Sequence, residues 1–347
     1  MKKNMFFTAI AVVFSMSAAT PLAGQQKPVN EKLEVQRIEK NKKKTKAEPK
    51  KVEEDSYVRF VFSGSAGTFL IGEKSQTVSS ERKLRSFRIS RFETTYSLWY
   101  KVRTWAENNG YVFSHPGQEG SQGGRGKAPT KTGCNEPVTN INWYDAVVWC
   151  NAYSEFSGKN PCYSYKGDVI RDATDTAICD LSKCDWNQNG YRLPSEAEWE
   201  FAARKTAKKL QSDLLASGQV DFNGDDDESV DVKSVGWISE NAKGTHTVGT
   251  AGTETDPRKA IPGSGNPNGA GLYDMCGNVL EFCWDWEAAY DVPSSTEYQA
   301  GPEYGSERVM RGGSWNEYTM FYASGDRYSF DPNEAYNYFG FRIAASE

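Results

Sequence analysis

The chain has 347 residues, of which 38% are hydrophobic and 13% aromatic, enough to bury one large core or two small ones. Its formal net charge of −5 argues against a nucleic-acid partner, because a protein that neutralises phosphates needs a basic face. His115 and His246 are the only histidines, which leaves little material for histidine-based catalysis or a zinc site.

Residues 1–24 have the layout of a secretory signal peptide. Two lysines precede an apolar run at residues 5–14, and small residues follow it. The run is too short to span a bilayer, so we expect export, with cleavage after Ala19 or Ala23. The mature chain should then carry no transmembrane helix and be periplasmic, at the cell surface or secreted. Residues 25–55 combine lysine runs with few aliphatics and predict a charged, disordered linker.

The folded domain is expected to cover residues 56–347. Segments 58–62, 68–72 and 87–92 have the composition and alternation of strands. Thr94 is the expected cap of a helix that ends at Asn109-Gly110. Residues 111–137 read as loop, and their glycine run lacks the Gly-Lys-Ser/Thr ending of a phosphate loop.

A second helix is predicted by four apolar residues spaced at i, i+3, i+4 and i+7. This spacing indicates one stripe that faces the core, made of Ala146, Trp149, Cys150 and Tyr153.

A third helix is predicted to begin at Ser195, which forms a capping box with Glu198. Acids in the first turn suit the helix dipole, and this explanation is simpler than a metal cluster. Further on, residues 221–228 are rich in Asp. They lack the glycine and the bidentate glutamate of an EF-hand, so a solvated acidic loop is expected, with weak calcium binding as the alternative.

The C-terminal stretch has strand-like ends at residues 308–311 and 339–343 and an unusual middle. Residues 316–338 contain five Tyr, two Phe and three Asn but no Leu, Ile or Val, whereas a buried segment normally carries branched aliphatics. Tyr, Ser, Asn and Gly are typical of recognition surfaces. The alternative is a polar, aromatic-rich loop of a structural domain.

Four motifs in order resemble the formylglycine-generating-enzyme (sulfatase-modifying factor) family: Arg-Leu-Pro-Ser-Glu-Ala-Glu-Trp-Glu at 192–200, Gly-Leu-Tyr-Asp-Met-Cys-Gly-Asn-Val at 271–279, Arg-Gly-Gly-Ser-Trp at 311–315 and Gly-Phe-Arg at 340–342. The resemblance covers about residues 58–345. It implies an α+β variant of the C-type lectin fold, loop-rich, with small twisted sheets and a few helices.

The oxidase chemistry of this family does not carry over to the chain. Its formylglycine-forming members bind copper through two cysteines, whose positions are occupied here by Glu317 and Tyr322, and no cysteine follows Cys283. Soft Cu(I) needs sulfur ligands, so neither copper nor enzyme activity is expected. The alternatives are a divergent formylglycine-generating-type oxidase and an inactive structural relative in the cell envelope.

The resemblance also implies a structural calcium ion. In the family this ion lies on the segment that matches Asp274, Gly277, Val279 and Glu281, with two side-chain and two backbone oxygens as ligands. Oxygen-only donors on a tight turn suit a hard cation. The alternative is a capped turn in which Glu281 forms a salt bridge.

The C-terminal stretch resembles the variable proteins of diversity-generating retroelements, of the Treponema type. In that subgroup, adenine-directed mutagenesis diversifies residues between fixed Gly-Gly-Ser-Trp and Gly-Phe-Arg flanks within a rewritten region, which corresponds here to residues 308–347. Three of the matching positions, Glu317, Met320 and Glu334, require changes at non-adenine bases. The implied ligand-binding residues are Asn316, Glu317, Tyr318, Met320, Phe321, Asp326, Tyr328, Ser329, Phe330, Asp331, Asn333, Glu334, Tyr336, Asn337 and Tyr338.

The resulting hypothesis is an exported, non-catalytic protein, monomeric, that binds a protein or glycan ligand on host or neighbouring cells. Seven cysteines in an exported chain permit up to three disulfides and leave one over, and their pairing stays open.

Overall fold

The computed structural model describes residues 56–62, 67–219, 230–253, 256, 259–292, 300–317 and 322–347. The predicted signal peptide (1–24), linker (25–55) and acidic loop (221–228) lie outside these residues. Within the described part, no helix has the length and apolarity needed to cross a membrane. All seven cysteines are described, and none of them is in a disulfide.

The described helices are α2 (Tyr96–Glu107), α3 (Trp143–Phe156), α4 (Thr176–Asp180) and α5 (Glu196–Arg204), with one 3-10 turn, η2 (Val232–Ser234). The cap of α2 is Thr95, whose Oγ1 accepts a hydrogen bond from Leu98 N, and not Thr94 as expected. The reason is that the main chain of Thr94 is hydrogen-bonded to Phe341 and Val138, so the helix begins one residue later.

Helix α3 is buried on every side rather than along the single predicted stripe, since every residue from Trp143 to Ser154 is buried. A helix that is covered all round lies inside a core. The third predicted helix, α5, begins as expected, because Ser195 and Glu198 form the reciprocal capping box.

Five small sheets complete the fold. The first has the order β1-β4-β14 and the second β12-β11-β10-β13, and the others are β2-β3, β5-β6 and β8-β7-β9. Their bounds are β1 (Tyr57–Phe60), β2 (Thr68–Ile71), β3 (Ser80–Lys83), β4 (Phe87–Ser90), β5 (Gln118–Glu119), β6 (Val138–Thr139), β7 (Tyr163–Tyr165), β8 (Asp168–Val169), β9 (Lys183–Cys184), β10 (Leu280–Trp286), β11 (Arg308–Arg311), β12 (Arg327–Phe330), β13 (Phe339–Gly340) and β14 (Ala344–Ser346).

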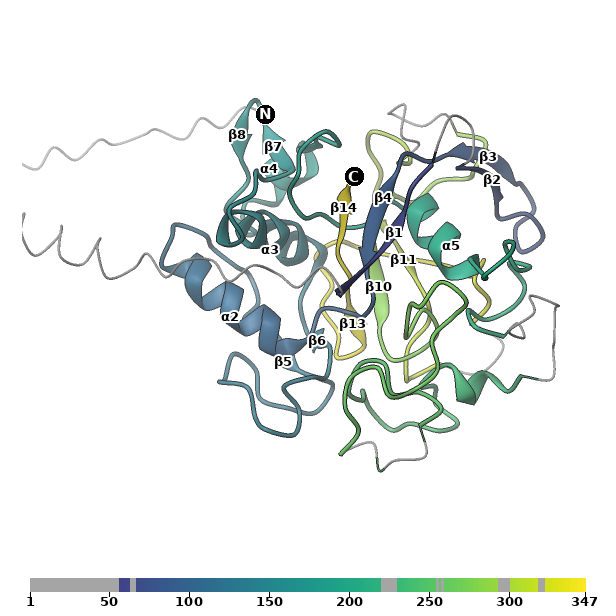
Figure 1. Ribbon diagram of the computed structural model, residues 1–347. Coiled ribbons are helices and arrows are strands. Elements are labelled where there is room, and N and C mark those ends of the chain that lie inside the picture. Colours follow the sequence, from purple (N-terminus) through teal and green to yellow (C-terminus); the bar gives the residue numbers. More distant parts are fainter. Residues whose placement is uncertain are drawn as a thin grey trace, which may run out of the picture. The chain divides into compact units, whose positions relative to one another are not determined.

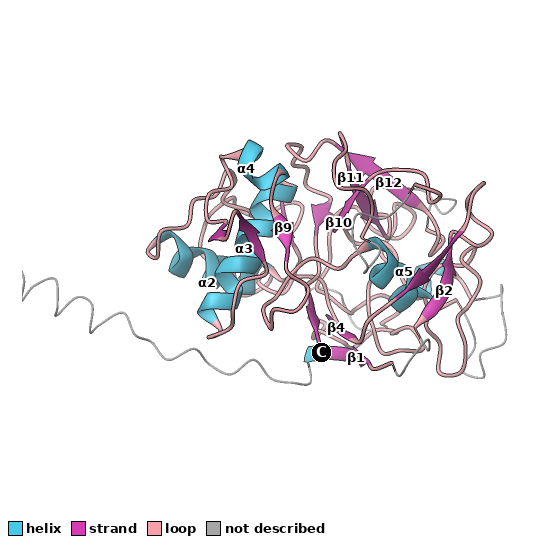
Figure 2. Cartoon of the chain, turned by 90° about the horizontal axis from the view of Figure 1, so that it is seen from above, coloured by secondary structure: helices cyan, strands magenta, loops and turns pink. Residues whose placement is uncertain are grey.

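The β1-β4-β14 and β12-β11-β10-β13 sheets lie between α2 and α3 on one side and α5 on the other (Figures 1 and 2). Strand alternation explains this arrangement, because successive side chains of a strand point to opposite faces. On β11, Met310 belongs to the core that contains α2 and α3, whereas Val309 belongs to the core that contains α5. The four-stranded sheet therefore separates two apolar cores.

The C-terminal residues differ from the two expected end strands in two ways. The predicted closing strand at 339–343 is divided between β13, which pairs in parallel with β10, and β14, which pairs with β4 in the other sheet. The middle segment, for which no strand was predicted, contains β12, which pairs with β11 in antiparallel register from Arg308–Phe330 to Arg311–Arg327.

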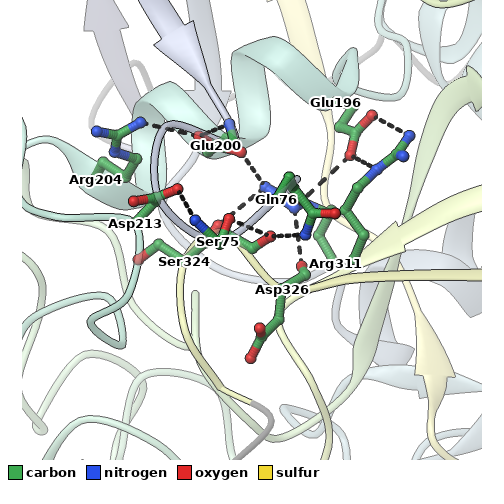
Figure 3. A network of polar contacts seen from close by, with 12 residues as sticks. Ser75, Gln76, Glu196, Glu200, Arg204, Asp213, Arg311, Ser324 and Asp326 are labelled. Carbon is green, nitrogen blue, oxygen red and sulfur yellow. Dashed lines mark hydrogen bonds and ion pairs between the residues drawn. The ribbon is translucent and has the colours of Figure 1, made fainter. Parts of the chain in front are cut away.

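Buried arginine–carboxylate pairs join the elements around α5 (Figure 3). The acids at its start therefore do more than suit the helix dipole. Glu198 accepts two hydrogen bonds of 2.6 and 2.7 Å from Arg192. Glu200, fully buried, accepts 2.7 Å and 3.0 Å hydrogen bonds from Arg311 and Arg204.

A further buried pair joins the end of the chain to β10. Arg342 Nε and Nη2 each lie 2.6 Å from an oxygen of Glu281, and both side chains are 0% exposed. Removing one partner of such a pair leaves an uncompensated buried charge.

Replacing Arg342 by Met should lower the free energy of unfolding by about 3–5 kcal/mol, because Glu281 then remains charged and buried. Urea denaturation followed by tryptophan fluorescence measures this change. Lys183→Met is the matched control: Lys183 lies 3.7 Å from Glu303 in an exposed pair, so its loss should cost about 1 kcal/mol or less. Equal effects of the two substitutions on the free energy of unfolding would contradict the role of Arg342 as the partner of a buried charge.

Candidate ligand-binding face

The C-terminal segment leaves β11 through a tight turn at Gly312 and Gly313. Both have positive φ, 95° and 70°, which glycine adopts without strain. A Cβ atom on Gly312 would lie 3.2 Å from the Trp199 ring. The turn is held by main-chain hydrogen bonds from Gly277 N to Gly312 O (2.8 Å) and from Trp315 N to Asn278 O (3.0 Å).

The segment then returns as β12 along the edge of the four-stranded sheet. Arg327 points inward, with its Nε and Nη2 2.6 and 2.9 Å from the carboxylate of Glu196 on α5. Tyr328 and Phe330 are half-buried and pack against the core that contains α3. The two rings of the strand are therefore partly exposed, whereas its arginine is paired with Glu196.

Several backbone carbonyls of this segment accept hydrogen bonds from the rest of the domain. Arg311 donates to the carbonyls of Asp326 (2.8 Å) and Ser324 (2.9 Å) (Figure 3). Further carbonyls accept main-chain N–H groups at 2.9–3.2 Å, in the pairs Trp143–Pro332, Asn140–Tyr336 and Leu280–Tyr338. Such bonds do not depend on the side chain that the segment residue carries.

Twelve of the fifteen predicted ligand-binding residues are described; Tyr318, Met320 and Phe321 lie outside the described residues. We call these twelve the ligand face. None of them is buried. Four are exposed (Asn316, Asp331, Asn333, Tyr336) and eight are half-buried (Glu317, Asp326, Tyr328, Ser329, Phe330, Glu334, Asn337, Tyr338).

The buried residues of the segment all lie outside this set. Tyr322 and Ser324 are 1% exposed, Phe339 is 0% exposed and Pro332 is buried, whereas Ala323, Arg327 and Ala335 are half-buried. The described positions of the predicted variable set thus include none of the inward residues that fill the core.

Phe339 is the inward residue that organises the aromatic side chains of the ligand face. Its ring centroid lies 4.7 Å from that of Phe330, 5.0 Å from that of Tyr336 and 5.1 Å from that of Tyr338, all in edge-on geometry. Tyr336 and Tyr338 stack on each other with centroids 5.3 Å apart and planes inclined by 4°. Three half-buried or exposed rings therefore surround one buried ring.

Polar side chains of the ligand face bond mostly to their own segment. Asp331 Oδ1 accepts from the backbone and side-chain nitrogens of Asn333, both at 2.9 Å. Tyr336 Oη lies 3.4 Å from Glu334 Oε1. Asn337 reaches further and donates to Ser121 O at 3.2 Å. Polar groups with local partners remain accessible to a ligand.

The positions that correspond to the copper-binding cysteines of the resembled oxidases do not offer copper ligands. The Tyr322 hydroxyl donates to the carbonyls of Ser314 and Glu317. Burial raises the pKa of the Glu317 carboxyl, whose Oε2 has no hydrogen-bond partner among the described residues. An oxygen donor set of this kind does not fit Cu(I), which prefers thiolates.

The residues of the expected calcium site lie together below the Gly312–Gly313 turn. Asp274 is 2% exposed, its Oδ2 accepts from Gly249 N, and its Oδ1 has no partner among the described residues. Burial raises the pKa of Asp274 to about 7. A buried, unpartnered carboxylate oxygen fits a hard cation.

Glu281 is in the salt bridge that was the alternative to calcium, and it also accepts 2.7 Å from Trp199 Nε1. Within the described residues, no group of three or more His, Cys, Asp or Glu side chains is arranged to hold a metal. The predicted ion uses two carboxylates and two carbonyls, so calcium stays a prediction.

Comparisons with known proteins agree on the domain type. Residues 44–347 match the family described as the sulfatase-modifying factor enzyme 1-like domain. The chain is 27% identical to the chaperone protein LppX of Paenibacillus barcinonensis over 70% of its length and 74% of that protein. It is 30% identical to the formylglycine-generating enzyme of Thermomonospora curvata over 61% of its length, and spans only 56% of that enzyme.

Among solved structures, the chain is similar to Treponema denticola variable protein 1, with 27% identity, a TM-score of 0.59, and coverage of 84% of this chain and 95% of that one. It also shares the fold of CarF, with 24% identity, a TM-score of 0.57, and coverage of 84% and 98%. The expected C-type lectin-like fold, α+β and loop-rich, is thereby confirmed.

The division into outward and inward positions predicts how substitutions affect stability. Asn316→Ser and Tyr336→Ser should each lower the free energy of unfolding by about 1 kcal/mol or less, because neither side chain is buried. Phe339→Ala should cost about 3–5 kcal/mol, because it removes a buried ring. Chemical denaturation of the three variants measures this; a large loss at Asn316 or Tyr336 would show that these side chains support the fold.

Proposed function

Because the chain belongs to the family of sulfatase-modifying factor enzyme 1-like domains, we propose that it is a non-catalytic member, exported and used to bind ligands. Its binding surface is the ligand face, completed by Tyr318, Met320 and Phe321. One observation carries the proposal: no described position of the predicted variable set is buried, while the buried residues of the same segment all lie outside that set.

The way the segment is held supports this function. Several of its contacts to the scaffold run through backbone carbonyls, which accept hydrogen bonds from Arg311 and from the amides of Asn140 and Leu280. A surface held in this way accepts different side chains at the same backbone positions, which is what a diversified binding protein requires. The similarity to a protein named as a variable protein points in the same direction.

The absence of catalysis is supported by the residues at the two copper positions. Glu317 and Tyr322 supply oxygens where the oxidases have thiolates, and Tyr322 is buried with its hydroxyl bonded to carbonyls. Membership of the family alone does not establish an oxidase, because function depends on the site and not on the fold.

The proposal predicts that ligand choice follows the outward residues. Exchanging all fifteen predicted positions for those of a natural variant, with Tyr322, Ser324, Pro332 and Phe339 kept, should change which proteins or glycans of an array are bound. The control exchanges an equal number of exposed residues outside residues 308–347. If the bound set is unchanged by the first exchange, the proposed function is wrong.

The DNA that follows the gene offers an independent test of the same proposal. A near-copy of the segment that encodes residues 308–347, differing at adenines and accompanied by a reverse transcriptase gene, is the expected finding. Without such a copy, the segment is an ordinary loop of the family and the chain is an inactive envelope protein.

We also propose that Asp274 and Glu281, with the carbonyls of Gly277 and Val279, hold a structural Ca²⁺ ion. Removal of calcium by EGTA should then lower the midpoint of thermal unfolding by about 5 °C, compared with the midpoint measured at a calcium concentration of about a hundred times its Kd. Asp274→Ala should abolish this response, and elemental analysis of the purified wild-type protein gives a second readout. If the purified protein contains no calcium and EGTA has no effect, the calcium proposal is wrong, and Arg342 is then the cationic partner of Glu281.

A further inference from the structure

The ligand face carries charge of one sign only. Its twelve residues include four carboxylates, those of Glu317, Asp326, Asp331 and Glu334, and no lysine, arginine or histidine. A fifth carboxylate borders it, because the exposed Glu307 accepts a hydrogen bond from Ser329 Oγ. Burial raises the pKa of Glu317 and of Asp326, so the negative charge that a partner surface has to compensate is mainly that of Asp331, Glu334 and Glu307.

The carboxylates lie around the aromatic rings rather than apart from them. Asp331 directly follows Phe330, and Glu334 Oε1 lies 3.4 Å from the hydroxyl of Tyr336, a ring that is 40% exposed. Burial raises the pKa of Tyr338, and the neighbouring Tyr336, Glu317 and Glu334 raise it further. Rings and carboxylates on one surface are the two groups that bind ammonium and guanidinium ions best.

Two arginines near the ligand face offer it little accessible positive charge. Arg327, on the same strand, is held by the carboxylate of Glu196. Arg308 is 2% exposed and lies between two indole rings, 3.6 Å from the centroid of Trp143 and 3.2 Å from that of Trp286. Arg125 is exposed and donates to the neutral side chains of Gln118 and Asn140, so it leaves one positive charge near the Asn337 end, fewer than the carboxylates of the face.

We infer that the ligand face recognises a protein partner through exposed lysine and arginine side chains, which lie over the tyrosine rings and pair with Asp331 and Glu334. This inference rests on the proposed function and specifies its partner class. Nucleic acids and anionic lipid surfaces are repelled by such a face. A neutral glycan is the competing ligand, and it would bind without dependence on charge.

The test uses a fluorescent peptide of about twelve residues, three repeats of Gly-Lys-Ser-Arg, and its counterpart in which Glu and Asp replace Lys and Arg. Fluorescence anisotropy should show that the basic peptide binds the wild-type protein, that binding weakens as salt increases, and that the acidic peptide does not bind. The double variant Asp331→Asn, Glu334→Gln should bind the basic peptide about fivefold more weakly, because two exposed ion pairs are lost.

The matched control is Glu81→Gln with Asp168→Asn, which changes the net charge equally at exposed residues of β3 and β8. It should leave peptide binding unchanged, and circular dichroism checks that both double variants are folded. Equal binding to both double variants, or no binding to the wild type, overturns the inference.

The exchange of the fifteen positions tests the proposed function separately. If ligand choice follows that exchange, but binding of the ligand does not depend on salt or on the Asp331 and Glu334 substitutions, only the charge inference is wrong. The result would then indicate a neutral ligand.

Discussion

Arg311 makes the interaction on which the binding segment depends. Its guanidinium is fully buried, bonded on one side to Glu200 of α5 and on the other to the carbonyls of Ser324 and Asp326. Burying a cation is costly unless it is paired and hydrogen-bonded, and here a carboxylate and two carbonyls accept from the two Nη groups, while Nε has no hydrogen-bond partner among the described residues. Because the segment contributes only backbone to this contact, the cation fixes the path of the chain without restricting its outward side chains. Tyr336 and Tyr338 are also held through the backbone, because their carbonyls accept hydrogen bonds from the amides of Asn140 and Leu280.

The two cores give this arrangement its rigidity. The four-stranded sheet is covered on one face by α3 and on the other by α5, so β11 lies between packed layers and its partner β12 lies at the edge (Figure 1). An edge strand has one hydrogen-bonded side and one free side, which is where ligands approach sheets. Rings that rest on a buried Phe339 lose little conformational entropy on binding, since their positions are already restricted. A rigid support with exposed rings and small polar groups is thus a physical basis for recognition by side-chain exchange.

The sequence predicted the features whose causes are local and missed those whose causes are distant. The capping box of Ser195 and Glu198 was predicted because both halves lie within one helical turn. The true cap at Thr95 was missed by one residue, since Phe341, remote in sequence, holds the main chain of Thr94. Strand β12 was not predicted, because its polar and aromatic residues lack the alternation of apolar and polar groups that marks a strand. Its strand conformation comes from pairing with β11, which is not visible in the local sequence. The outward positions were predicted only through the family resemblance, and the pair of Arg342 with Glu281 appeared only as an alternative to calcium.

The position of the last strands has a consequence for synthesis and quality control. The last residues of the chain complete parts of the domain that are synthesised earlier. Strand β14 pairs with β4, and Arg342 neutralises Glu281 inside the core. The residues proposed to bind ligand therefore precede, in the order of translation, the residues that close the fold. A copy with a premature stop or a shifted reading frame in this segment loses these closing residues, leaves a buried carboxylate unpaired and exposes the edge of β4. Such a chain cannot complete its core and would be open to proteolysis, so that folding itself selects copies whose reading frame is intact.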